Sequence, residues 1–492
     1  MLLSSLFKDI PYTLLAGSIE IPVTGIAFDS REVEPGSLFI AIAGFTVDGH
    51  DFIAKAVELG AAAILVERDV TVEGSVSVLK VGDTRAAMAR LAAAFYGNPS
   101  DQLQVIGVTG TNGKTSSAYF IKSILEESGQ TMGVIGTIGA LAGGRALATR
   151  STTPTTPESL HLQHMFADMK ESGVTSCVME VSSHALSLHR AAATNFRIGV
   201  FTNLTPDHLE LHRTMEDYFE AKAMLFDMTT EANVINLDDE YGVKLAERLK
   251  GRDARLITYG IEATAEVYAT DIRLEADHTF YIAHTPEGSI DICVKLPGLI
   301  YVYNSLAAVA CAYAAGIQPS HIAKGIRAVS SIKGRLEVVY QDEDRKVVVD
   351  FAHTEDGLEK ALTTLKPFTK GRLILVFGVY AAPGELGSPK RNAMGKVAAQ
   401  YADLSIVTSD NPKNQDPDAI IAEVSAVVAA EGGQYIGIVD RKEAIRHAID
   451  ISRKDDVILI AGKGHETTQV IGKTEIPFNE AEIVQEWISG KA

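Results

Sequence analysis

Short apolar runs alternate with longer segments of mixed polarity along most of the chain, and this pattern predicts an α/β protein. Near the start, "GSLFIAIAGFTVDGHDFIAKAVELGAAAILVER" at 36–68 predicts a strand, a glycine-bearing turn, a helix and a second strand. The segment "LQVIGVTG" at 103–110 is typical of a buried strand, and a helix is predicted from about Lys114. Because helix-like segments separate several later apolar runs, we expect a mainly parallel sheet with helices on both faces.

The C-terminal third of the chain repeats this alternation. Five apolar runs follow residue 336, with helical segments predicted between them. Three of these runs end directly in polar clusters, namely "DFAHT", "SDNPK" and "GKGHE". In open α/β sheets, ligands bind at the carboxyl ends of the strands. We therefore expect a second doubly wound unit with a binding site at that edge.

These patterns divide the chain into three predicted domains. A length of 492 residues suits about three domains of roughly 150 residues each. The stretch "YGNPSDQ" at 96–102 is rich in turn-forming residues, which predicts a linker. We expect domains at 1–98, 99–335 and 336–492. The predicted fold is α/β with three domains, of which the central one is a doubly wound sheet with a phosphate-binding loop (P-loop) and the C-terminal one is Rossmann-like.

Charge and composition exclude some classes of partner. The chain has 63 acidic and 45 basic residues and a formal charge of −18, whereas nucleic acids and anionic membranes need a basic face. The most apolar stretch, 300–317, begins with polar residues, which favours a buried helix over a membrane span. The N-terminus lacks the features of a signal peptide, and the spacing of the three cysteines suits neither zinc nor a redox pair. We expect no nucleic-acid or membrane partner and a cytoplasmic location.

The segment "GVTGTNGKTSS" at 107–117 is the strongest chemical signal in the sequence. It resembles a P-loop, except that Val108 stands where the first glycine is usual. It also lies between a predicted strand and a predicted helix, so that backbone N–H groups could hold phosphates. Lys114 would then reach the β and γ oxygens, and Thr115 would hold Mg²⁺. The alternative is a glycine-rich turn that happens to contain a lysine.

Three further residues could belong to the same site. Glu180 ends an apolar strand in "VMEVSSHALSLHR" and is either a second metal ligand or a solvated strand end. His208 follows another strand, and a lone histidine is more often structural. Lys222 has apolar neighbours on the following helix, where a lysine usually extends its ammonium to the surface.

A set of ordered motifs now points to a known family. The motifs are "GVTGTNGKT", "MEVSSHAL", "TNLTPDHLELH" with "EAK", "YNSLAA", "GRLE", "DFAHT", "SDNP" and "GKGHE". Together they resemble the Mur ligases, and specifically the ligases that add the third peptide residue to UDP-N-acetylmuramoyl-L-alanyl-D-glutamate in peptidoglycan synthesis. The resemblance extends from "FDSR" at 28–31 to "GKGHE" near the C-terminus. It implies that "TGTNGKT" is this family's own phosphate loop.

The resemblance implies an ADP-forming amide ligase. ATP would phosphorylate the glutamyl carboxylate, and the amine of an amino acid would attack the acyl phosphate. The implied cofactors are ATP, Mg²⁺ and a carbamylated lysine formed from CO₂. The implied catalytic residues are Lys114, Glu180, His208 and Lys222, of which Glu180 and Thr115 hold one metal, and His208 and carbamylated Lys222 hold another. The implied ATP-site residues are Gly110, Thr111, Asn112, Gly113, Lys114, Thr115, Ser116, Asn304, Arg335 and Asp350.

The same resemblance implies sites for the other two substrates. Residues matching the UDP-muramoyl-peptide site are Ser30, Thr46 in the "FTVDG" turn, Thr155, Thr156, Ser182 and Arg190. Residues matching the amino-acid site are Arg391, Asp410, Asn411, Lys413, Gly462 and Glu466. The implied partners are therefore UDP-N-acetylmuramoyl-L-alanyl-D-glutamate and a dibasic amino acid.

Two segments depart from the family pattern. Where the family has "GCGGDRD" before "KRP", this chain has "GVYAAPGELGSPKRN", which retains only "KR", so that Arg391 can still be aligned. Where ligases that add meso-diaminopimelate have "DNPR", this chain has "DNPK". Lys413 keeps the positive charge but lacks the two-pronged geometry of arginine. Glu466 remains to bind an ammonium group, so meso-diaminopimelate is favoured over L-lysine or another amino acid.

Three functions remain open from the sequence. The first is a ligase of the main peptidoglycan pathway. The second is a paralogous ligase that uses L-lysine or another amino acid elsewhere, which the altered 379–389 segment motivates. The third is a non-catalytic binder of UDP-muramoyl peptides. Against it stands the retention of four residues, namely Lys114, Glu180, His208 and Lys222. A folylpolyglutamate synthase-like ligase shares the ATP-binding plan, but "DSR" and "TTPES" favour a UDP-sugar substrate.

Overall fold

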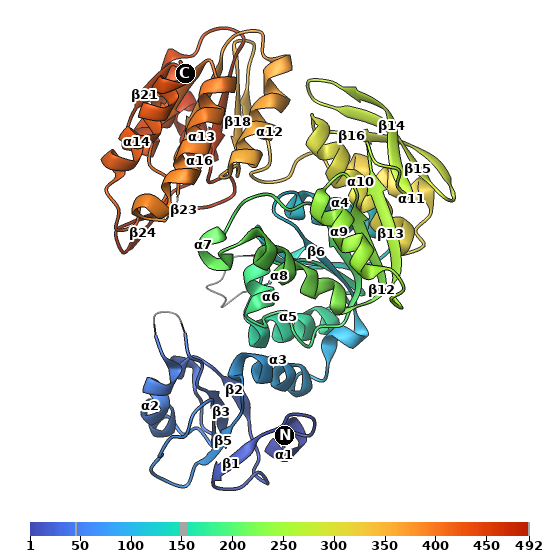
Figure 1. Cartoon of the computed structure of the whole chain (residues 1–492), viewed down its shortest axis with the longest axis vertical. Helices are drawn as coiled ribbons and strands as arrows, with labels where there is room; N and C mark the ends of the chain where they lie inside the picture. Colours follow the sequence, from blue (N-terminus) through green and yellow to red (C-terminus); the bar gives the residue numbers. More distant parts are fainter. Residues whose placement is uncertain (45–46, 148–154, 381, 491–492) are drawn as a thin grey trace.

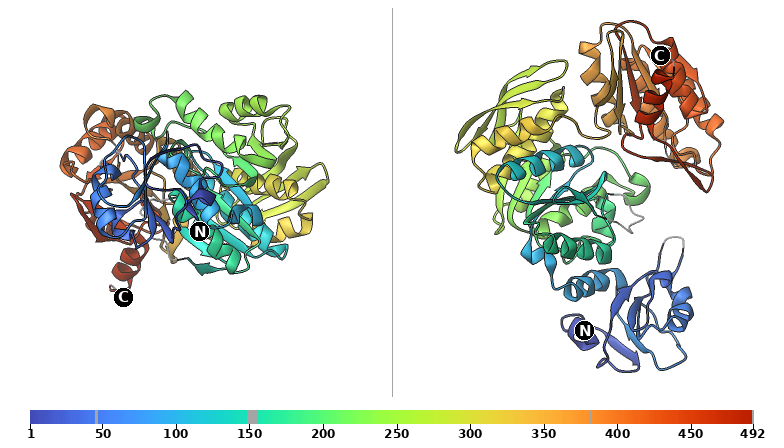
Figure 2. Two further views of the ribbon diagram at one scale, coloured as in Figure 1. Left: turned by 90° about the horizontal axis from the view of Figure 1, so that it is seen from below. Right: turned by 180° about the vertical axis from the view of Figure 1, so that it is seen from behind.

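The computed structural model describes residues 1–44, 47–147, 155–380 and 382–490. Three large sheets follow one another along the chain and along the long axis of the molecule, with the N-terminal sheet at one end and the C-terminal sheet at the other (Figure 1). The view from behind shows the same serial arrangement (Figure 2). Candidate site residues are thus distributed over three separate structural units.

The N-terminal unit is a five-stranded sheet in the order β1-β5-β4-β3-β2. Its strands from β2 to β5 pair in parallel, and β1 joins β5 antiparallel. The strands are β1 (Thr13–Ala16), β2 (Gly25–Ala27), β3 (Ser37–Ile40), β4 (Ala63–Val66) and β5 (Ser77–Lys80), and the helices are α1 (Leu3–Leu6), η1 (Ser30–Glu32), η2 (Gly49–Phe52), α2 (Ile53–Glu58) and α3 (Thr84–Phe95). The two strands and the helix predicted within 36–68 are confirmed, whereas part of the predicted turn lies outside the described residues.

The central unit is an eleven-stranded mixed sheet. The strands in spatial order are β16 (Gly288–Val294), β15 (Thr279–Thr285), β14 (Val267–Leu274), β13 (Arg255–Gly260), β12 (Thr229–Asn236), β11 (Phe196–Phe201), β6 (Gln104–Thr109), β10 (Ser176–Glu180), β7 (Met132–Gly136), β8 (Gly139–Ala142) and β9 (Arg145–Ala146). Pairing is parallel from β14 through β7, as predicted. The antiparallel pairings at both edges were not predicted.

Helices pack on this sheet and position the P-loop. They are η3 (Pro99–Gln102), α4 (Lys114–Glu127), α5 (Ser159–Glu171), α6 (Ser183–Ser187), α7 (Leu209–His212), α8 (Met215–Asp227), α9 (Glu240–Leu249), α10 (Leu299–Ala314) and α11 (Pro319–Ala328). Most of the apolar stretch 300–317 lies in α10, which is buried against the sheet as expected. Among the described residues, no helix combines the length and apolar character needed to cross a bilayer.

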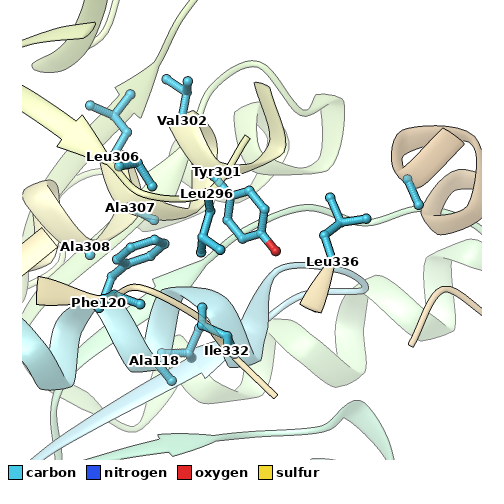
Figure 3. Packing of buried hydrophobic residues seen from close by; sticks show 14 of the residues in the cluster. Ala118, Phe120, Leu296, Tyr301, Val302, Leu306, Ala307, Ala308, Ile332 and Leu336 are labelled. Carbon is cyan, nitrogen blue, oxygen red and sulfur yellow. The ribbon is translucent and has the colours of Figure 1, made fainter. Parts of the chain in front are cut away.

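The core between α4 and α10 supports one edge of the nucleotide site. Phe120 of α4 meets the ring of Tyr301 of α10 edge to face at 6.5 Å, and Ile332 and Leu336 pack beside them (Figure 3). The Tyr301 hydroxyl donates a 2.7 Å hydrogen bond to the carbonyl of Arg335. Because these side chains are buried, the backbone at Arg335 is tied to the helix that begins at the P-loop.

The C-terminal unit is a six-stranded sheet in the order β17-β18-β22-β19-β20-β21, parallel except for β17. Its strands are β17 (Glu337–Gln341), β18 (Arg345–Asp350), β19 (Leu373–Phe377), β20 (Leu404–Val407), β21 (Tyr435–Gly437) and β22 (Asp456–Ala461), with a hairpin of β23 (Thr468–Ile471) and β24 (Thr474–Pro477). Its helices are α12 (Glu355–Leu365), η4 (Lys366–Phe368), η5 (Gly384–Leu386), α13 (Ser388–Tyr401), α14 (Pro417–Ala430), α15 (Arg441–Ile451) and α16 (Glu480–Ser489). The predicted second doubly wound sheet is confirmed.

Candidate active site

The P-loop leaves β6 and begins α4, as the sequence predicted. Gly113 adopts φ +86°, and a Cβ there would lie 2.4 Å from the side-chain oxygen of Asn304, so both the conformation and the space require glycine. The Lys114 ammonium donates to the carbonyls of Gly110 at 2.9 Å and Thr111 at 2.8 Å. The loop therefore curls around a lysine at a helix N-terminus, which is a geometry that binds phosphate.

Glu180 meets Thr115 because β10 pairs with β6, placing Glu180 opposite Val108. The Thr115 hydroxyl lies 3.0 and 2.9 Å from the two carboxylate oxygens. Thr137 donates to the same carboxylate from its backbone N–H at 3.0 Å and from its hydroxyl at 2.9 Å. Arg335 donates to Thr115 at 3.0 Å. A buried carboxylate, a hydroxyl and a guanidinium thus converge beside the P-loop.

Lys222 does not reach the surface. Its side chain is 1% exposed, and its nitrogen donates to the Gly110 carbonyl at 2.8 Å and lies 4.5 Å from the centre of the Tyr218 ring. Burial lowers the pKa of Lys222 well below its ordinary value, and repulsion by Lys114 lowers it further, while Asp207 acts in the opposite direction. The usual interpretation of such a lysine, with its ammonium in solvent, is therefore wrong here.

Asp207 lies near Lys222 and contacts His208. The His208 ring lies 3.3 Å from the Asp207 carboxylate, and Lys390 of the C-terminal unit approaches the same carboxylate at 3.8 Å. Burial raises the pKa of Asp207, but the attraction of His208, His353 and Lys390 outweighs it and the net shift is downward. Asp207 is thus a negative charge between two units of the chain.

The residues at the P-loop fit a hard cation in part. Thr115 and Glu180 supply hydroxyl and carboxylate oxygens, which Mg²⁺ prefers. Across the described ranges, no three histidine, cysteine or acidic side chains are grouped closely enough to hold a metal by themselves. A cation here would therefore rely on the threonine hydroxyl and on oxygens from another source, such as nucleotide phosphates. Lys222 offers an oxygen only if its amine is modified.

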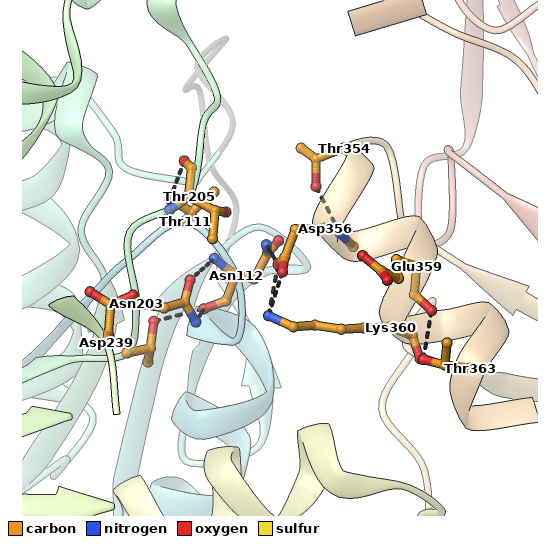
Figure 4. Close-up of polar contacts among 12 residues, drawn as sticks. Thr111, Asn112, Asn203, Thr205, Asp239, Thr354, Asp356, Glu359, Lys360 and Thr363 are labelled. Atoms are coloured by element: carbon orange, nitrogen blue, oxygen red, sulfur yellow. Dashed lines mark hydrogen bonds and ion pairs between the residues drawn. The ribbon is translucent and has the colours of Figure 1, made fainter. Parts of the chain in front are cut away.

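A cavity of about 330 Å³ lies beside the P-loop, between the central and C-terminal units. The Asn112 side chain donates to Asp356 of α12 at 2.6 Å, and Lys360 pairs with Asp356 at 2.7 Å (Figure 4). Residues lining the cavity include Asn112, Gly113, Asn203, Asp238, Tyr303, Asn304, Lys360 and Thr364. A nucleotide bound at the P-loop would therefore touch two domains.

The Asp350 carboxylate binds backbone N–H groups and does not line the cavity. It accepts hydrogen bonds from the N–H groups of Leu336 at 2.6 Å and Ala352 at 2.7 Å, and burial raises its pKa while Arg335 opposes that shift. The Arg335 guanidinium also lies 4.6 Å from the centre of the Phe351 ring. These contacts fix Arg335 where the central and C-terminal units join.

The predicted muramoyl-peptide residues lie in two places. Ser30 begins η1 in the N-terminal unit, and Thr46 lies outside the described residues. Thr156 and Ser182 are joined by a 3.1 Å hydrogen bond from the Ser182 N–H to the Thr156 hydroxyl. The remaining two candidates lie near this pair, since Thr155 contacts Thr137 at 3.0 Å and Arg190 donates toward the Thr156 carbonyl at 3.5 Å.

The predicted amino-acid residues meet at the carboxyl ends of β20 and β22, except for one. A Cβ on Gly462 would lie 2.8 Å from the Asp410 carboxylate, and Asn411 contacts Glu466 at 3.4 Å. Arg391 is 3% exposed and instead pairs with Glu423 at 2.6 Å while donating to the carbonyls of Ala382 and Gly384. In this structure Arg391 holds the altered loop.

Several residues at these sites were missed from the sequence. They are Asp207, Thr137, Asp356 and Lys360, together with Lys463, which is buried and contacts Glu466 at 2.6 Å. Asp207, Asp356 and Lys463 each lie inside or next to a motif already identified, in "TPDHLELH", "DFAHTED" and "GKGHE". Their proximity to these motifs could have identified them from the sequence. No such motif surrounds Thr137, because only the pairing of β7 with β10 brings it to Glu180.

Taken together, a P-loop on the central sheet, a Rossmann-like third unit and a cavity between them define a nucleotide-binding α/β protein. Family models match three stretches of the chain: the Mur ligase family catalytic domain at 22–96, the Mur ligase middle domain at 108–312 and the Mur ligase glutamate ligase domain at 334–464. The chain belongs to the Mur ligase family, as the motifs indicated.

Relatives of similar length support this assignment. The chain is 42% identical over 99% of its length to the UDP-N-acetylmuramoyl-L-alanyl-D-glutamate–2,6-diaminopimelate ligase of Clostridioides difficile, covering 100% of that protein. It is 44% identical over 99% of its length to the ligase of the same name from Alkaliphilus metalliredigens, covering 97% of it. A solved structure of a ligase of that name is 30% identical, with a TM-score of 0.68 and 99% coverage of both chains.

Proposed function

We propose that the chain adds meso-diaminopimelate to UDP-N-acetylmuramoyl-L-alanyl-D-glutamate, with hydrolysis of ATP to ADP, in peptidoglycan synthesis. The names of its full-length relatives support this activity. The structural observation that carries the proposal is the convergence of Lys114, Thr115 with Glu180, and Arg335 at one P-loop. The alternative of a protein that binds only UDP-muramoyl peptides does not account for this array, because such a protein would have no ATP phosphates to hold at the P-loop.

The proposed chemistry follows from the weakness of a carboxylate as an electrophile. Transfer of the γ-phosphoryl group to the glutamyl carboxylate forms a P–O bond and releases ADP. The incoming amine then forms the C–N bond, and inorganic phosphate leaves. Lys114 and Arg335 would balance the charge on the transferring oxygens, which is where cations contribute most in such reactions.

We further propose that Thr115 and Glu180 hold one Mg²⁺, and that His208 and a carbamylated Lys222 hold a second. Bound Mg²⁺ would neutralise phosphate charge and orient the phosphoryl group. The depressed pKa of Lys222 favours the neutral amine, which is the form that reacts with CO₂. Carbamylation would convert a buried neutral amine beside Lys114 into an anionic oxygen donor, which the positive charge of Lys114 would stabilise.

Substrate roles are proposed domain by domain. Residues 1–98 would bind the UDP end through Ser30 and Thr46, 99–335 would bind ATP, and 336–492 would bind the amino acid. The cluster of Thr155, Thr156, Ser182 and Arg190 would contact the muramoyl peptide, and that of Asp410, Asn411, Lys413, Gly462 and Glu466 would contact the amino acid, with Arg391 supporting the adjacent loop. We place the enzyme in the cytoplasm, to which its three free cysteines are suited.

A turnover assay tests the proposal. Purified protein with Mg²⁺, ATP and the muramoyl dipeptide should release ADP and phosphate only when an amino acid is added, and meso-diaminopimelate should give the highest kcat/KM in a panel with L-lysine and ornithine. Release of AMP and pyrophosphate would contradict the acyl-phosphate route. The altered 379–389 segment favours one second candidate, a paralogous ligase, and a clear preference for a different amino acid in the same panel would support it.

A further inference from the structure

The two segments that depart from the family pattern contact each other in the structure. Tyr380 belongs to the altered segment after β19, and Lys413 replaces the arginine of "DNPR" after β20. The Lys413 nitrogen donates to the Tyr380 hydroxyl at 2.8 Å and lies 4.6 Å from the centre of its ring. No pattern in the sequence connects these two residues, which are separated by 33 positions.

The backbone holds both residues close together. Strands β19 and β20 are parallel neighbours, so the segments that follow them leave the same edge of the sheet. A Cβ on Gly378 would lie 2.6 Å from the Asp410 N–H nitrogen, which shows how closely the segments approach. Lys413 has φ +51°, donates its N–H to Val470 at 3.2 Å and accepts from Gly472 at 2.8 Å. The β23–β24 hairpin therefore fixes the starting point of the lysine side chain.

The charge of Lys413 is available to a ligand. Within the described part of the chain, no carboxylate forms an ion pair with it. Tyr380 is 45% exposed, so the pair faces solvent rather than the core. The neighbouring Asn411 contacts Glu466, and Lys463 contacts the same carboxylate, which places the pair beside the proposed amino-acid site.

The hydrogen-bond donors and acceptors of the two side chains indicate what the pair can bind. A lysine ammonium has three N–H donors and no acceptor, whereas a phenol both accepts and donates. When Tyr380 accepts from Lys413, its own O–H stays free to donate outward. Two donor atoms 2.8 Å apart are then available to one carboxylate, much as the two nitrogens of an arginine fork bind a carboxylate through two parallel bonds.

We propose that Tyr380 and Lys413 together form a two-donor clamp for the second carboxylate of the incoming amino acid. This inference rests on the proposed function. Tyr380 is thereby a specificity-determining residue of this ligase. The phenol replaces the second prong that a lysine lacks, and it also restrains a flexible side chain that would otherwise lose rotamer freedom on binding. An amino acid without a second carboxylate gains nothing from the clamp.

Tyr380→Phe tests the clamp because it removes one oxygen and keeps the ring. We expect the KM for meso-diaminopimelate to rise about tenfold to a hundredfold, as for a lost hydrogen bond to a charged group. The kcat for meso-diaminopimelate and the KM for L-lysine should each change less than twofold. Tyr435→Phe is the matched control, since this tyrosine is 44% exposed on β21 of the same domain. Thermal melting checks that both variants remain folded.

Replacing the lysine provides the decisive comparison. Lys413→Arg in the Tyr380→Phe background should restore the KM for meso-diaminopimelate to within threefold of wild type, because arginine supplies both donors itself. A structural role for the tyrosine predicts no such rescue. If wild type uses meso-diaminopimelate and Tyr380→Phe leaves its KM unchanged, the clamp is wrong and the proposed function stands. If wild type prefers an amino acid with one carboxylate, or releases no ADP with any amino acid, the proposed function fails and the clamp fails with it.

Discussion

At the scale of single residues, Lys222 illustrates how far a motif can guide interpretation. Its type and spacing were recognised from "EAK", but its apolar neighbours alone favoured a surface lysine. Only the structure shows the amine buried against Gly110 and Tyr218 and beside Lys114. Burial of a charged group has an unfavourable free energy, so a lysine at this position without a functional role would only destabilise the fold.

Lys222→Met should abolish ligase activity and stabilise the unmodified protein. Between its lowered folded pKa and its ordinary value near 10.5, Lys222 must lose a proton when the chain folds. The unfolded state then binds more protons, so stability rises with pH across that window, and methionine removes this dependence. Urea unfolding of CO₂-free protein at pH 7 and pH 9 measures the difference.

Lys250→Met is the control for that experiment, because Lys250 is 63% exposed in the same domain and should show neither effect. A methionine variant of Lys222 with full activity would contradict the proposed metal ligand. Partial recovery of Lys222→Ala by short carboxylic acids would support it, since these acids can supply the missing oxygens.

Gly113→Ala should raise the KM for ATP at least tenfold. The added methyl would meet Asn304 at 2.4 Å in a left-handed backbone conformation, so the loop must shift where it faces the nucleotide. Gly251→Ala is matched in conformation, at φ +77°, but has no atom within 4 Å of the new methyl. Both variants should lose about 1 kcal/mol of stability from backbone strain, and ATP kinetics should change only in Gly113→Ala.

At the scale of helices and strands, the buried parallel strands were predictable and the antiparallel ones were not. Continuous apolar runs identified β6, β10, β19 and β22, because both faces of those strands are covered. Strands β14–β16 bury alternate residues instead, and their apolar content is diluted by polar positions. The site residues divide in the same way. Residues that directly follow or end a buried strand were predicted from the sequence. Thr137 was not predicted, because only the pairing between strands brings it to the site.

Gly325→Ala should weaken both folding and ATP binding through one helix contact. A Cβ on Gly325 of α11 would lie 2.4 Å from the Ile124 Cα of α4, and backbone cannot yield as a flexible side chain can. Helix α4 carries the P-loop at its first turn, so its displacement reaches the phosphate site. We expect a lower Tm and a higher KM for ATP. Ala328→Val on the exposed end of α11 is the control and should change neither.

At the scale of the whole molecule, the sequence indicated three units but not how they meet. The contacts between the central and C-terminal units pair residues far apart in the chain, such as Asn112 with Asp356 and Asp207 with Lys390. No local pattern of hydrophobicity encodes such pairs. They arise from the placement of α12 and α13 against the P-loop and the segment after β11.

Asp356→Ala should loosen this arrangement. Without the 2.6 Å bond to Asn112 and the ion pair with Lys360, we expect a larger radius of gyration for the nucleotide-free protein in solution scattering and a higher KM for ATP. Glu355→Ala, an exposed neighbour in the first turn of α12, should match wild type in both measurements. An unchanged radius of gyration in Asp356→Ala would show that other contacts hold the two units together.

The cavity beside the P-loop has walls from two domains, with Asn112 and Asn304 on one side and Lys360 and Thr364 on the other. A nucleotide held there would contact both domains, so its release would be coupled to any movement of one domain relative to the other. Such a movement displaces water around a whole domain, whereas bond-breaking in the site does not. If release of ADP limits turnover, raising the viscosity of the solution should therefore lower kcat.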